Sequence, residues 1–69
     1  MTFRCWYKDG SARLITSHSH KNAAGEAQEL AQIQNGDMPK EGDERQRFLD
    51  ACKVVRTENL TDGTEKKWR

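Results

Sequence analysis

The chain has 69 residues, of which 33% are hydrophobic and 33% are charged, and its formal net charge is only +1. A chain of this length forms one domain, and residues 1–69 are expected to bury only about 60% of their unfolded surface. No apolar run approaches the ~20 residues that cross a bilayer, and two cysteines are too few for a secreted disulfide scaffold. We therefore expect a cytoplasmic protein without a signal peptide or membrane segment. Small domains with few apolar residues often need an additional stabilising element, such as a metal, a disulfide or a second subunit. A homodimer is therefore among the expectations.

Residues 3–17 are predicted to form a β-hairpin. Asp9-Gly10 is a strong signal for a two-residue turn, in which both central positions need a positive φ. That turn pairs Trp6 with Arg13 and Cys5 with Leu14. Alternation then predicts a core-facing side made of Phe3, Cys5, Tyr7, Ala12 and Leu14, and an outer side that carries Arg4, Trp6, Lys8, Arg13 and Ile15.

Residues 20–35 are predicted to form a helix, with Ser19 as its N-cap and Asn35-Gly36 as its end. Small and apolar residues recur there at helical spacing: Ala23, Ala24, Ala27, Leu30, Ala31 and Ile33. This stripe is expected to lie on a sheet.

A second, shorter helix is predicted after the breaker-rich linker 35–43, with Asp43 as its N-cap and Phe48, Leu49 and Cys52 on one face. Residues 53–60 could prolong this helix or form a strand. We favour a strand that returns through Asp62-Gly63, a turn that pairs Thr57 with Trp68. The predicted fold class is α+β, a small antiparallel sheet in β-β-α-α-β-β order with two helices packed on one face.

Four residues of the chain are candidate ligands of a metal centre. Cys5, Cys52, His18 and His20 supply nitrogen and sulfur atoms of the kinds that bind zinc, but the two cysteines are far apart in sequence and form no tight pair. We therefore expect small core cysteines, no metal and no cofactor. A buried thiol is a poor nucleophile and so small a core can hardly enclose a pocket, so we expect no enzyme activity.

Charge is unevenly distributed along the chain. Residues 1–21 carry four bases against one acid, residues 22–52 seven acids against three bases, and residues 53–69 five bases against three acids. The candidate binding residues are therefore basic or aromatic, except for the apolar Ile15, and come from both ends of the chain: Arg4, Trp6, Lys8, Arg13, Ile15, Lys66, Lys67 and Trp68, with Arg69 beside them. The bases of a nucleic acid stack on such aromatic residues while basic side chains bind its phosphates, so nucleic acid is one candidate partner.

The alternative partner is a protein. The isoelectric point of about 7.8 is low for a dedicated nucleic-acid binder, and acidic residues of the middle region could face a basic partner: Glu26, Glu29, Asp37 and Glu41. The competing explanation of these charges is a solvated helix face.

The layout of residues 3–34, a hairpin that leads into a helix, resembles the small sheet-plus-helix DNA-binding domains of phage-type integrases, although their third strand is missing here. The whole chain is similar in size and layout to small phage proteins that bind and inhibit a host protein. We therefore expect a small non-enzymatic protein-binding module, such as a phage- or mobile-element-type inhibitor or regulator, and keep a nucleic-acid-binding domain as the alternative.

Overall fold

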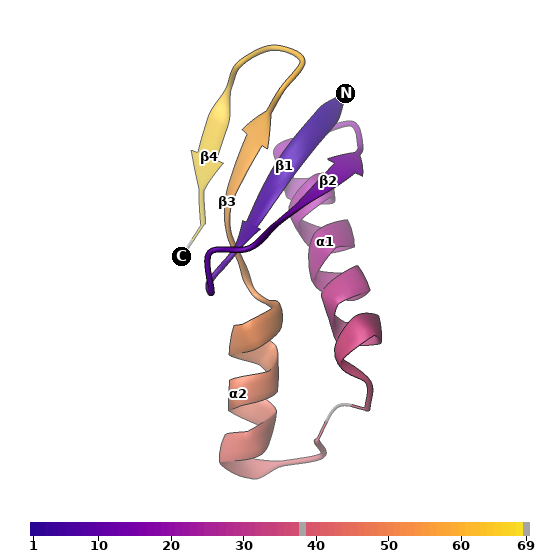
Figure 1. The fold of residues 1–69 in the computed structure, drawn as a ribbon, viewed down its shortest axis with the longest axis vertical. Coiled ribbons are helices and arrows are strands. Elements are labelled where there is room, and N and C mark those ends of the chain that lie inside the picture. The colour runs from indigo at the N-terminus through magenta and orange to yellow at the C-terminus, as the bar shows by residue number, and fades with distance from the viewer. Residues whose placement is uncertain (38, 69) are drawn as a thin grey trace.

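The computed structural model describes residues 1–37 and 39–68 and has the predicted element order. In chain order the elements are β1 (Thr2–Tyr7), β2 (Ala12–Thr16), α1 (His20–Asn35), α2 (Gly42–Cys52), β3 (Val54–Asn59) and β4 (Glu65–Lys67). All neighbouring strands pair antiparallel in the order β2-β1-β3-β4 (Figure 1). The α+β prediction is confirmed, and residues 54–59 form a strand rather than prolonging the helix.

The first hairpin has a different register from the predicted one. Trp6 pairs with Ala12 instead of Arg13, and Cys5 pairs with Arg13 instead of Leu14. The cause lies in the turn, because Gly10 has a φ of 91° and only glycines among the described residues have a positive φ. Asp9 therefore does not adopt the conformation that a two-residue turn requires, and the chain forms a three-residue loop closed by a 2.8 Å bond from the Tyr7 amide to the Ser11 carbonyl.

A shift of one residue exchanges the two faces of β2 but leaves those of β1 unchanged. Phe3, Cys5 and Tyr7 are buried as predicted. On β2 the expectation was wrong, since Ile15 is buried and 61% of Leu14 is exposed.

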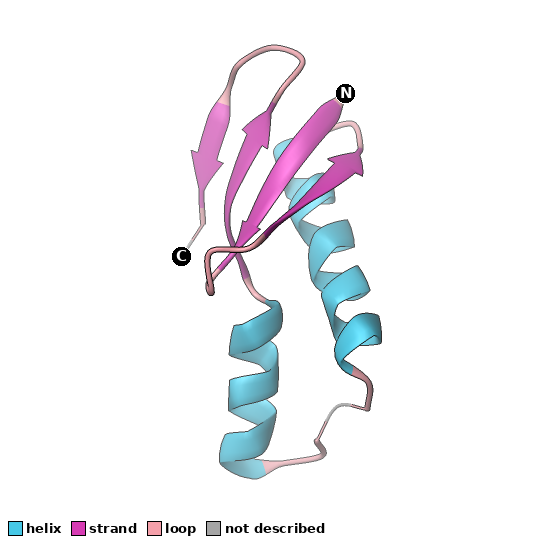
Figure 2. Cartoon of the chain, viewed as in Figure 1, coloured by secondary structure: helices cyan, strands magenta, loops and turns pink. Residues whose placement is uncertain are grey.

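Helix α1 covers one face of the sheet (Figure 2). Ser19 caps it as predicted, accepting a 3.2 Å hydrogen bond from the Asn22 amide, and the helix ends before Gly36. The residues it buries are all alanines: Ala23, Ala24, Ala27 and Ala31. Leu30 and Ile33 were predicted to belong to this stripe, but they are 39% and 70% exposed and lie on the flank of the helix instead.

Helix α2 contributes less to covering the sheet than expected. It extends past the end of the sheet and packs along the C-terminal half of α1 (Figure 1), which makes the molecule elongated, at 40 × 19 × 17 Å. Its N-cap is Glu41 rather than Asp43, which falls in the first turn, where the helix dipole favours a carboxylate. Cys52 is buried and Phe48 packs against the core, as their shared face predicts.

The second hairpin also has a longer loop than predicted. Asn59 accepts hydrogen bonds on its side chain from the Thr61 and Asp62 amides, and its own amide donates to the Thr64 carbonyl at 2.7 Å. This four-residue loop pairs Thr57 with Lys66, two positions from the predicted partner.

A chain of hydrogen bonds with one consistent direction connects this hairpin to α1. The Trp68 indole donates to the Thr57 hydroxyl at 3.1 Å, and that hydroxyl lies 2.8 Å from Nδ1 of His20. His20 Nε2 lies 2.8 Å from the Thr64 hydroxyl, which donates to Asp62 at 2.6 Å. Each hydroxyl donates to the next group if His20 carries its proton on Nε2.

Candidate functional site

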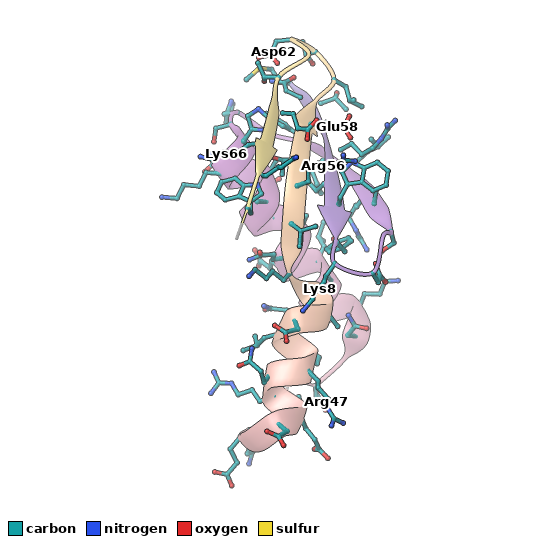
Figure 3. All side chains as sticks on the ribbon, turned by 90° about the vertical axis from the view of Figure 1, so that its left-hand side faces the viewer. Lys8, Arg47, Arg56, Glu58, Asp62 and Lys66 are labelled. Atoms are coloured by element: carbon teal, nitrogen blue, oxygen red, sulfur yellow. The ribbon has the colours of Figure 1, made fainter. Side chains whose placement is uncertain are left out.

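The side of the sheet turned away from α1, here called the open face, carries the main candidate site. Alternation along the paired strands places on it Arg4, Trp6, Leu14, Arg56, Glu58, Glu65 and Lys67. Figure 3 shows Arg56 and Glu58 on one side of β3 and Lys66 on the other. No helix in the described ranges, 1–37 and 39–68, covers this face.

Trp6 is the centre of the open face. Its ring lies 5.9 Å from Cζ of Arg4 and 4.7 Å from Cζ of Arg56, both within the range of a cation–π interaction. Its indole nitrogen donates a hydrogen bond to Glu58. The ring is therefore fixed from several sides while part of it remains accessible.

Arg56 also joins the acidic residues of the open face. Its guanidinium lies 3.2 Å from the Glu58 carboxylate and 3.9 Å from the Glu65 carboxylate. Neither acid was among the predicted site residues, and the sequence gives no sign that β3 and β4 bring them next to Trp6. The carboxylates offset part of the positive charge that Arg4, Arg56 and Lys67 place on this face.

A bulge in β3 opens a hollow beside Trp6. Tyr7 pairs with Val54 and Trp6 pairs with Arg56, so Val55 is the additional residue. The hollow measures about 450 Å³ and is lined mainly by Trp6, Lys8, Val55, Arg56, Lys67 and Trp68. Because it lies on the surface of the sheet, it offers a contact surface rather than an enclosed chamber.

The predicted basic cluster at the C-terminus is divided between the two sides of β4. Lys67 pairs with Arg56 and shares the open face. Lys66 pairs with Thr57 and turns to the other side, with Nζ 4.5 Å from the centre of the Trp68 ring. Trp68 extends the pairing through a 2.8 Å bond from its amide to the Val55 carbonyl. Arg69 lies outside the described residues.

Two of the predicted outer residues, Arg13 and Ile15, lie on the helix side of the sheet. This correction follows from the register of the first hairpin. The Arg13 guanidinium donates to the side chain of Gln34 on α1, and Ile15 is 6% exposed in the core. Leu14, predicted to face inward, takes their place on the open face.

The four acidic candidates are all exposed and belong to the helical layer. Glu26 and Glu29 are on α1, away from its buried alanine stripe, whereas Asp37 and Glu41 are in the connection between the helices. None of them lines the hollow of the open face or belongs to the strands that form this face.

The predicted cysteine and histidine candidates are held apart by other contacts. Cys5 and Cys52 are both buried and free, and burial, with Glu26 nearby, raises the pKa of the Cys5 thiol from 9.0 to about 11. The Cys5 thiol is therefore protonated at neutral pH and unsuited to nucleophilic attack. His20 is engaged by Thr57 and Thr64, and His18 is exposed. In the part of the chain that the structure describes, no three His, Cys, Asp or Glu side chains come together to hold a metal.

No helix among the described residues combines the length and apolar character needed to span a membrane. Comparisons with family models, with curated proteins and with solved structures gave no significant match to this chain. Its function is therefore argued from the open face and the residues around it.

Proposed function

We propose that this chain is a non-enzymatic binding module that contacts a partner protein through the open face of its sheet. The observation that carries the proposal is Trp6, held between Arg4 and Arg56 on a face that no described helix covers. Such a module would regulate or inhibit its partner by occupying part of the partner's surface.

The residue types of the open face and the fixed orientation of Trp6 support this function. Trp and Arg are the residues most enriched among those that dominate protein–protein binding energies. Trp6 is already oriented by Glu58 and by two guanidinium groups, so little side-chain freedom is lost when a partner covers it. The adjacent hollow, whose lining includes Val55, could receive an apolar side chain of the partner.

The carboxylates of the open face favour a protein over a nucleic acid. Arg56 is paired with both Glu58 and Glu65, and two acids beside Trp6 would repel the phosphates of a stacked strand. Arg4, Lys8 and Lys67 add positive charge at the margin of the face. The expected partner surface therefore has an apolar residue at its centre and a few acids around it.

The test is retention of a host protein on immobilised chain. We expect the wild type and a Glu29→Gln variant, altered on the acidic helical layer, to retain the same protein. Trp6→Ala and Lys67→Glu should each lose it, and the retained protein, once purified, should bind the wild type alone in solution. Loss with Glu29→Gln and retention with Trp6→Ala would move the site to the acidic layer and contradict the proposal.

A second measurement tests whether the partner is a nucleic acid instead of a protein. Mixed-sequence DNA and RNA are titrated at low salt into a Trp68→Phe chain, in which Trp6 is the only tryptophan reporter. We expect no change in fluorescence. Saturable binding that weakens steeply as salt rises, together with labelled strands that the wild type shifts in a gel and Trp6→Ala does not, would replace the protein partner with a nucleic acid.

A further inference from the structure

The edge of β2 is a second surface, which adjoins the open face at Leu14 and continues on the flank of α1. We propose that this edge pairs with the β2 edge of a second copy of the chain, which forms a symmetric dimer with a continuous sheet. The argument rests on the direction of the backbone groups of β2, on three exposed apolar side chains beside it, and on the self-complementarity of the strand.

The backbone groups of β2 alternate between β1 and the free edge. The Tyr7 amide donates to the Ser11 carbonyl. The Ser17 amide donates to the Met1 carbonyl and the terminal ammonium group of Met1 donates to the Ser17 carbonyl, both at 3.0 Å. Residues at odd positions of β2 thus bond to β1, whereas the amides and carbonyls of Ala12, Leu14 and Thr16 turn away from β1. No further described strand lies on that side, so these groups can accept another strand.

Three of the exposed large apolar side chains lie along this edge. Leu14 is 61% exposed on β2 itself. On α1, Gln34 bonds to Arg13 of β2, so the flank of the helix that carries Gln34 faces the β2 edge. Leu30 is one turn before Gln34 on the same flank, and Ile33 is next to Leu30 on the helix surface. Leu30 is 39% exposed and Ile33 is 70% exposed.

If a two-fold axis passes through Leu14, the free backbone groups of this edge can bond to those of a second copy. Antiparallel pairing about the axis sets Leu14 against Leu14, Ala12 against Thr16 and Arg13 against Ile15, so no like charges meet. The α1 helices of the two copies then run antiparallel on the same side of the continuous sheet.

The opposite edge of the sheet lacks these features. Strand β4 has only three residues, Glu65, Lys66 and Lys67, and all are charged. Short, charged edge strands resist further pairing. The core, in turn, consists largely of alanines and cysteines, so burial of Leu14, Leu30 and Ile33 would add apolar area that the monomer lacks.

The test is the mass of the full chain in solution, measured by sedimentation velocity over a wide range of concentrations. We expect the wild type to pass from monomer to dimer as the concentration rises. Leu14→Lys and Ile33→Lys should each shift the transition to at least ~10-fold higher concentration, because a charge then replaces an apolar contact. Leu60→Lys, at an exposed position in the loop between β3 and β4, is the matched control and should dimerise as the wild type does.

A crosslink fixes the geometry of the interface. In antiparallel register two copies of residue 14 lie about 5.5 Å apart at Cα, within the range that a disulfide spans. The Leu14→Cys chain should therefore form a disulfide-linked dimer on mild oxidation, whereas Leu60→Cys should not. A wild type that stays monomeric at every concentration, or a dimer that Trp6→Ala abolishes and Leu14→Lys leaves intact, would overturn the proposal. Because Trp6→Ala tests the open face separately, failure of the dimer would leave the proposed function standing.

Discussion

The guanidinium of Arg56, from the third strand, lies 4.7 Å from the centre of the Trp6 ring, on the first strand. The same guanidinium contacts Glu58, which also accepts the hydrogen bond of the Trp6 indole. The three side chains thus form a closed set of contacts across the β1–β3 pair. This set connects the stability of the central strands to the surface that we propose for binding.

The Trp6–Arg56 contact should be measurable as a coupling energy. In a double-mutant cycle of Trp6→Leu and Arg56→Gln, we expect a coupling of about 0.5–1 kcal/mol, the usual value for a partly exposed cation–π pair. The free energies of unfolding are measured in urea. Strict additivity of the two substitutions would show that the pair contributes no net stability.

Stability should decline in alkaline solution because of Cys5. Burial raises the pKa of its thiol from 9.0 to about 11 in the folded chain, so between these values the unfolded chain loses its proton and the folded chain retains it. The contribution is complete below pH 9 and is lost as the pH rises to about 11, at most about 1.4 kcal/mol for each pH unit. Burial also raises the pKa of Tyr7, which extends the decline in the same direction.

The measurement is the free energy of unfolding in urea at a series of pH values, for the wild type and for Cys5→Ala. The variant removes a titrating group while keeping a small side chain in the core, so its curve should be flatter over this range. Equal slopes for both chains would show that Cys5 has the same pKa in the folded and unfolded states.

Two glycines should respond to alanine in opposite directions. Gly10 has a φ of 91°, which strains any side chain, so Gly10→Ala should destabilise the chain by about 1 kcal/mol or more. Gly25 is inside α1 with open space where a Cβ would lie, so Gly25→Ala should stabilise it by about 0.5–1 kcal/mol. Thermal melts of both variants provide the check, and a stabilising Gly10→Ala would argue against the three-residue loop.

His20 should be a structural residue whose ring nitrogens have fixed roles. His20→Ala removes the contacts to Thr57 and Thr64 and the edge-on packing against Phe3, whose ring centre is 5.0 Å away. We expect a loss of about 2–3 kcal/mol. His18→Ala is the matched control, since that side chain is exposed, and should change stability by less than about 0.5 kcal/mol.

The tautomer of His20 gives an independent measurement of the same network. The direction of the hydrogen bonds from Trp68 to Asp62 requires the proton on Nε2. Nitrogen–proton correlation NMR of the folded chain should show that form at neutral pH. A proton on Nδ1 instead would mean that Thr57 and Thr64 exchange their roles.

The sequence by itself determined the features that depend on neighbouring residues. Ser19 and Gly36 set the ends of α1, as predicted, because caps act within one turn. Alternation along β1 correctly placed Cys5 inside and Trp6 outside, because successive side chains of a strand always point to opposite faces.

Only the tertiary structure decided which residues of the other strands join Trp6. Because the φ of Asp9 is not positive, as a two-residue turn would require, β2 is shifted by one residue from the predicted register. This shift places Arg13 and Ile15 on the helix side. Pairing of β1 with β3 brought in Arg56 and Glu58, from the far end of the chain. The physical reason is that register depends on the turn conformation and on packing across the sheet, and neither is encoded in the residue pattern of one strand.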